Sequence, residues 1–192
     1  MKEPPGRLPF LTREQIGSLI AQCSEHLRPI VLTALNTGMR KSEILNLKWE
    51  DVHLGNRWIT LYKTKNNEMR RIPINDTLLG VLRELERKKS GDYLFCRDGN
   101  RVGEIKKGFK AACRRAGISD FTFHDLRHIY ASYLIMGGAD IRSVQQLLGA
   151  QGYPYDNALF SSFGRTLTGS SEPYSFWHKS GTKSCRRKTK VV

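Results

Sequence analysis

Four cationic side chains, far apart along the chain, have the chemistry needed to hold one phosphodiester. Arg40 follows a Thr-Gly turn signal, Lys65 stands beside an Asn-Asn pair, and His124 precedes Arg127 by three positions. An arginine fork binds two phosphate oxygens at once, and a histidine can donate to an oxygen or carry a proton. Such a set would neutralise the charge that grows on a phosphate under attack. Taken singly, each of these residue types is more often an ordinary solvated charge.

His124 and Arg127 are expected on one face at the start of a helix. Residues three apart on a helix are neighbours, and Thr122 is the predicted N-cap of a helix that runs to about Met136. The unpaired N–H groups and the dipole of a helix N-terminus favour an anion. The spacing therefore predicts an anion site in the first turns of this helix.

The elements that must position these residues are mostly helical. Capping signals and apolar periodicity predict helices that open after Thr12 and cover residues 30–36, 41–47, 77–89, 105–116 and 141–148, with Asn75 and Asp140 as N-caps. Alternation predicts a hairpin from strands 58–62 and 69–72, with Lys65 at its tip, and a short strand over 93–95. The predicted fold class is mainly α with a small antiparallel β-hairpin or sheet (α+β).

The composition restricts the kind of protein. The 192 residues suffice for one domain with tails, and 32 Lys and Arg against 18 Asp and Glu leave a formal charge of +14. This excess favours a polyanionic partner such as nucleic acid, although simple solubility also explains it. The four cysteines lack CxxC spacing, so we expect reduced and mostly buried thiols.

Membrane insertion and export are not expected. No run of 18 apolar residues exists, and the first residues lack the apolar block of a signal peptide. We therefore expect a cytoplasmic protein, which would be associated with the nucleoid if its polyanionic partner is DNA.

Four segments, in order, resemble the tyrosine recombinase (phage integrase) family. Asn36–Leu45 resembles the box of the first arginine, Thr64–Pro73 the lysine hairpin, Thr122–His128 the second box, and Val144–Gly149 the helix that follows. The resemblance covers about residues 10–149 and implies a recombinase catalytic-domain fold there, with residues 1–9 as an N-terminal tail.

The resemblance implies an enzyme that breaks and rejoins DNA through a 3′-phosphotyrosine intermediate, with no metal or nucleotide cofactor. It implies that Arg40 and Arg127 stabilise charge on the attacked phosphorus and that Lys65 protonates the departing 5′ oxygen. His124 would assist proton transfer. The implied partner is double-stranded DNA, on which such enzymes self-assemble, and no membrane or small-molecule cofactor is implied.

The chain departs from the family pattern after Gly149. The family continues with Gly-His and then the nucleophilic tyrosine, whereas this chain continues with Ala150 and lacks the expected tyrosine box. Tyr153, Tyr155 and Tyr174 have neighbours that do not match. Residues 150–192 are rich in Ser and Gly and are expected to be a disordered tail outside the family pattern.

A frameshift near Gly149 would explain this departure. The codons allowed for residues 150–162 permit, one nucleotide out of frame, His-Lys-Asp-Ile-Arg-Met-Thr-Met-Arg-Tyr-Ser-His-Leu. That string is similar to the missing family boxes, and the coding DNA tests the hypothesis directly.

Three functions remain open at this level. The chain is an active recombinase that uses one of the atypical tyrosines, a catalytically dead DNA-binding remnant of an integrase, or a helical interaction module unrelated to DNA. Target sequence, integration versus excision, and oligomeric state are not readable from the chain.

Overall fold

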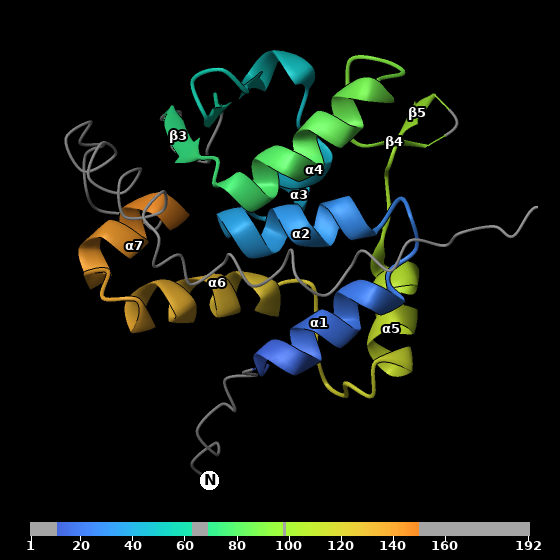
Figure 1. Cartoon of the computed structure of the whole chain (residues 1–192), viewed down its shortest axis with the longest axis vertical. Coiled ribbons are helices and arrows are strands. Elements are labelled where there is room, and N and C mark those ends of the chain that lie inside the picture. Colours follow the sequence, from blue (N-terminus) through green and yellow to red (C-terminus); the bar gives the residue numbers. More distant parts are fainter. Residues whose placement is uncertain (1–10, 63–68, 98, 150–192) are drawn as a thin grey trace, which may run out of the picture.

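One helix, α2, lies at the centre of the part of the chain that the structure, a computed structural model, describes: residues 11–62, 69–97 and 99–149. The helices in these ranges are α1 (Arg13–Gln22), α2 (Arg28–Thr37), α3 (Lys41–Leu45), α4 (Asp76–Arg87), α5 (Lys106–Arg115), α6 (Asp125–Met136) and α7 (Ile141–Leu148), with one 3-10 turn, η1 (Trp49–Asp51). In Figure 1, α2 runs between α4 and α6 and contacts both. Its residues from Thr33 to Thr37 are all buried, as expected of a helix covered on several sides.

The strands form two small antiparallel sheets. The larger has the order β1 (Val52–His53), β2 (Trp58–Leu61) and β3 (Arg70–Pro73), and the smaller pairs β4 (Cys96–Arg97) with β5 (Asn100–Arg101). In the larger sheet Leu61 lies opposite Arg70, so the β2–β3 hairpin is confirmed. The predicted fold class, mainly α with a small antiparallel sheet, is correct.

Three predicted helix caps are confirmed. The Thr12 hydroxyl accepts from the Gln15 backbone N–H at 3.3 Å, while the Gln15 side chain accepts from the Thr12 N–H at 2.9 Å. The Asp140 carboxylate caps α7 by accepting from the Ser143 N–H at 3.0 Å. Asn75 caps α4, and its amide also donates to the buried Asn36 side chain of α2 at 2.7 Å. This last bond joins α2 to the beginning of α4.

The strand predicted over 93–95 is wrong. Tyr93 forms only an isolated bridge with Lys48, and the strand begins at Cys96. The apolar side chains of Leu94 and Phe95 pack into the core, where each is 3% exposed, and do not belong to a strand. A short apolar run does not distinguish core packing from strand pairing. The third strand of the larger sheet is β1, which sequence reasoning missed because it has only two residues.

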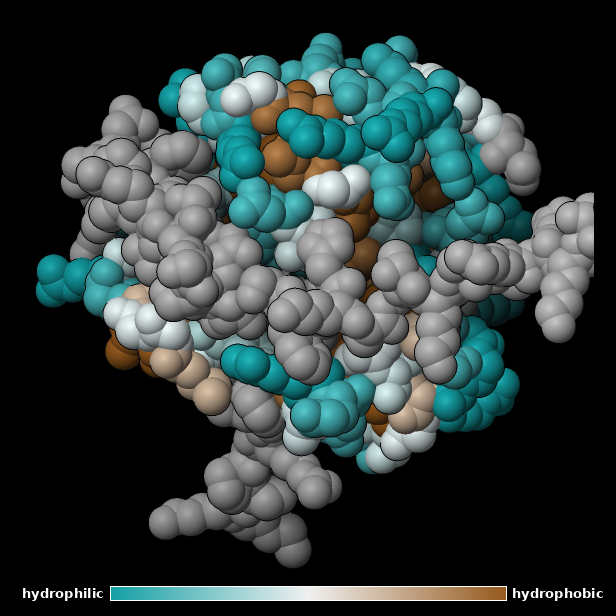
Figure 2. Space-filling view, viewed as in Figure 1, coloured by the Kyte–Doolittle hydropathy of each residue, from teal (hydrophilic) through white to brown (hydrophobic). Residues whose placement is uncertain are grey.

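Hydrophilic residues cover most of the coloured surface in Figure 2, and the buried apolar residues form one continuous core. Two of the cysteines, Cys23 and Cys113, belong to this core, and Cys96 is half-buried. None of the helices in the described ranges has the length and apolar character needed to cross a bilayer. Lys65 and the predicted tails 1–9 and 150–192 lie outside the described residues.

Candidate active site

Three of the four residues selected from the sequence lie together in the structure. Arg127 donates from Nη1 to the Gly38 carbonyl at 2.7 Å, which brings the first turn of α6 to the end of α2, two residues before Arg40. The charges of Arg127 and Arg40 both help to lower the pKa of His124. Arg127 and Gly38 are 89 positions apart in the sequence, and one hydrogen bond joins them in the fold. The fourth residue, Lys65, lies outside the described residues.

Gly38 creates the turn that presents Arg40. It ends α2 in the left-handed conformation, with φ of 61°, and its N–H donates to the Ala34 carbonyl at 2.9 Å. A Cβ at this position would collide with the side chains of Tyr130 and Leu148. Gly38 is therefore required both for its backbone conformation and for the close packing of α2 against α6 and α7.

Arg40 begins α3 and is paired with a carboxylate. Its Nη1 lies 3.0 Å from Glu43 Oε1, and its backbone N–H donates to Glu43 Oε2 at 2.8 Å. The Arg40 side chain is 45% exposed, whereas that of Glu43 is 13% exposed. Glu43 therefore fixes the orientation of the Arg40 guanidinium, while part of the Arg40 side chain faces solvent.

The Arg127 guanidinium donates hydrogen bonds to two backbone carbonyls. Nη1 donates to Gly38, and Nη2 donates to Leu148 at the end of α7. Burial, followed by the charges of Arg40 and Arg70, lowers the pKa of Arg127 to about 10. The group stays protonated at neutral pH, and each terminal nitrogen carries a second N–H for an anion.

His124 is the N-cap residue of α6 and is exposed. Its ring meets the ring of His128 edge-on, with the centroids 5.0 Å apart. Partial burial, followed by the charges of His128 and Arg127, lowers the pKa of His124 below its ordinary value. The imidazole is therefore largely neutral at pH 7, so it can accept a proton or donate from one nitrogen.

The predicted cap of α6 is wrong. Thr122 does not cap the helix; the Asp125 carboxylate accepts from the Thr122 N–H at 2.6 Å and from its hydroxyl at 2.8 Å. A carboxylate in the first turn is a stronger acceptor than a hydroxyl, and the helix dipole stabilises its charge there. His124 and Arg127 still lie at the helix N-terminus, as the spacing indicated.

Sequence reasoning missed two residues of this cluster, Glu43 and Arg70. Arg70 of β3 is buried, and its Nη2 lies 2.7 Å from Glu43 Oε2. One signal was available: Arg70 and Arg71 are adjacent on a strand, so their side chains point to opposite faces. One of two such arginines must face inward and needs an acidic partner.

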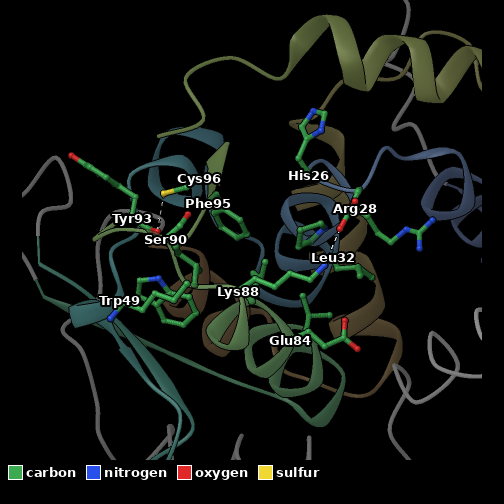
Figure 3. Close-up of a pocket in the computed structure, with 16 residues that line it drawn as sticks. His26, Arg28, Leu32, Trp49, Glu84, Lys88, Ser90, Tyr93, Phe95 and Cys96 are labelled. Carbon is green, nitrogen blue, oxygen red and sulfur yellow. Dashed lines mark hydrogen bonds and ion pairs between the residues drawn. The ribbon is translucent and has the colours of Figure 1, made fainter. Parts of the chain in front are cut away.

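A separate cavity of about 590 Å³ lies at the other end of α2. Figure 3 shows Arg28 and Leu32 of α2, Glu84 of α4 and Lys88, which follows α4, around it. Lys88 is paired with Glu25 at 2.9 Å across exposed side chains. None of the residues Arg40, His124 and Arg127 lines this cavity, so it is not part of the cationic cluster.

Comparisons with known proteins show which family the chain belongs to. The model of the phage integrase family matches residues 9–151. The integrase of Salmonella phage P22 is 32% identical over 158 residues, which cover 74% of this chain and 41% of that protein. The chain therefore spans less than half the length of this relative.

Solved structures show the same fold. A crystal structure of XerA recombinase matches with a TM-score of 0.66 and 25% identity, over 84% of this chain and 64% of that one. A lambda integrase dimer bound to a COC′ core site also matches with a TM-score of 0.66, at 20% identity, over 81% of this chain and 63% of that one. Since the family model covers well over half of the chain, this protein belongs to the phage integrase family.

Proposed function

We propose that this chain binds double-stranded DNA and holds one phosphodiester among Arg40, His124 and Arg127, as the catalytic domain of a site-specific recombinase. The observation that carries the proposal is the convergence of α2, α3, α6 and α7 on these residues. In the full reaction a tyrosine oxygen attacks phosphorus, the bond to the 5′ oxygen breaks, and a 3′-phosphotyrosine forms.

The roles follow from the surroundings of each side chain. Arg40 and Arg127 neutralise the charge that develops on the non-bridging oxygens, because their carbonyl and carboxylate partners fix them beforehand. His124 holds an oxygen and assists proton transfer. Lys65, on the connection between β2 and β3, protonates the departing 5′ oxygen. No metal or nucleotide is required in this scheme.

A basic helix supports a polyanionic partner. Five exposed cations lie on the ten residues of α5, which contains no acidic residue: Lys106, Lys107, Lys110, Arg114 and Arg115. The helix lies at the lower right of Figure 1, a region where Figure 2 shows hydrophilic surface. Contacts of this kind with DNA phosphates release counterions and make binding depend on salt. The DNA-bound lambda integrase dimer supports duplex DNA as partner and self-assembly on it. The proposed location is the cytoplasm, on the nucleoid.

A second candidate is DNA binding without cleavage. The family match ends at residue 151, and the sequence after Gly149 departs from the family's nucleophile box. On this reading the chain is a remnant of an integrase that keeps the phosphate-binding residues. The coding DNA for residues 148–162 tests its origin: codons that forbid the shifted reading frame would exclude the frameshift.

One experiment distinguishes the two candidate functions. The full chain is incubated with a nicked suicide duplex, with and without EDTA, and covalent adducts are resolved by denaturing electrophoresis. An adduct that EDTA does not abolish supports the recombinase, whereas salt-sensitive binding without adduct supports the remnant. Replacing Lys106 and Lys110 by Ala should reduce the slope of log K against log salt by about 1.8. Absence of duplex binding at low salt excludes both candidates.

A further inference from the structure

Arg70 joins three elements of the candidate site from a buried position. Its Nη1 donates to the Leu148 carbonyl at 2.7 Å, and its Nη2 pairs with Glu43 Oε2 at 2.7 Å. The side chain comes from β3, the carboxylate from α3 and the carbonyl from the end of α7. Only 5% of the side chain is exposed, so Arg70 itself is shielded from any DNA in solution.

Both acceptors of Arg70 also hold a proposed phosphate-binding arginine. Glu43 is the partner of Arg40, and the Leu148 carbonyl accepts from Arg127 as well. We infer that Arg70 is a positioning residue that sets the relative placement of Arg40 and Arg127. This inference rests on the proposed function, in which those two arginines bind one phosphate.

The geometry requires an arginine at position 70. A guanidinium presents two terminal nitrogens in a rigid fork, which here reach a carboxylate and a carbonyl from different elements. A lysine keeps the charge but has a single ammonium on a flexible stem. The packing also constrains position 149, because a Cβ on Gly149 would collide with Arg70 Nη1. The end of α7 is thus shaped around this side chain.

The protein contains a reporter for the placement of the two arginines. Within the described residues, the charges that contribute most to the shift in the pKa of His124 are those of His128, Arg127, Asp125 and Arg40. Arg70 does not belong to this set. Because Arg70→Lys keeps the positive charge at position 70, a change in the titration of His124 in that variant reports movement of its neighbours and not a lost charge.

The experiment follows the imidazole of His124 by NMR in the full chain, with His124→Gln to assign its signal among the five histidines. The variants are Arg70→Met and Arg70→Lys, and Arg127→Met confirms that the reporter responds. Arg71→Met is the matched control, because it removes one cation from the next position of β3, where the side chain stacks on Trp58 instead. Thermal melting shows whether each variant is folded.

Both Arg70 variants should raise the titration midpoint of His124, and Arg71→Met should leave it unchanged. Arg70→Lys keeps Glu43 paired, so it tests the inference even if Arg70→Met fails to fold. Affinity for a duplex should fall about tenfold in Arg70→Lys and change little in Arg71→Met. A wild-type midpoint in folded Arg70→Lys, while Arg127→Met shifts it, overturns the inference. If the wild-type chain does not bind DNA, the proposed function fails, whereas the titration still tests the placement.

Discussion

Arg127 and Gly38, 89 positions apart in sequence, are joined by a hydrogen bond of 2.7 Å from the guanidinium to the backbone carbonyl. The bond ties the first turn of α6 to the turn that ends α2. Because Arg40 follows Gly38 by two residues, the same contact that fixes one arginine also limits where the other lies. The architecture of the candidate site depends on this pair.

Arg40→Ala and Arg127→Ala should weaken DNA binding to a similar extent but differ in stability. Arg127→Ala should lower the free energy of unfolding by about 2 kcal/mol, since it loses charge-assisted bonds to two partly buried backbone carbonyls. Arg40→Ala should lower it by less than about 1 kcal/mol, because its ion pair is half exposed. Urea denaturation and duplex binding measure the two effects.

Where an adduct forms, either substitution should reduce its rate by roughly 10²–10³-fold, by analogy with the loss of one oxyanion donor. A reduction below about tenfold removes that residue from the site.

Gly38→Ala should destabilise the protein by about 2–3 kcal/mol. The φ of 61° strains an alanine, and its methyl group would enter the space of the Tyr130 and Leu148 side chains. Gly17→Ala is the matched control, because Gly17 lies within α1 and has open space around it. That control should stabilise the protein by roughly 0.5–1 kcal/mol, as expected for a helix interior. Equal effects in chemical denaturation would contradict the proposed packing.

His124 should link both stability and DNA binding to pH. Its pKa is lower in the folded protein than its ordinary value of 6.5, so between the two values the unfolded chain binds more protons. The contribution of His124 to stability is therefore complete above about pH 6.5 and is lost as the pH falls through the folded pKa. His124→Gln should flatten this part of the stability curve.

A bound phosphate should raise the pKa of His124, because negative charge favours the imidazolium. Duplex affinity should then rise as the pH is lowered from 8 to 6 at constant salt, and this dependence should shrink in His124→Gln. His128→Gln distinguishes the contributions of the two neighbouring rings. An unchanged pH dependence in both variants would place the phosphate elsewhere.

Cys23 and Cys113 should resist alkylation in the native protein. Burial raises the pKa of each thiol to about 11, so little thiolate exists near neutral pH. Cys96 is half-buried and should react before Cys23 and Cys113. Mass spectrometry of peptides after a short exposure to iodoacetamide compares these three positions. Faster labelling of Cys113 than of Cys96 would indicate that α5 opens readily.

Much of the candidate site was predictable because its signals are local. The spacing of His124 and Arg127 places both at one helix end, and Gly38 with Arg40 marks the end of one helix and the beginning of the next. Caps such as Thr12 and Asp140 act within three residues, so they too are readable from the chain. The prediction of Thr122 as an N-cap was wrong for a comparable local reason, since the Asp125 carboxylate accepts hydrogen bonds from the Thr122 N–H and hydroxyl.

The sequence by itself determined the helical fold class, the family resemblance, the cationic residues and the excess of positive charge, because these depend on residue types and on short spacings. Only the tertiary structure decided that Glu43 and the Leu148 carbonyl each serve two arginines. Such sharing joins segments separated by 27 and 78 positions, and no local pattern encodes it. A backbone carbonyl also has no side-chain identity, so its role becomes visible only when α6, α7 and β3 pack together.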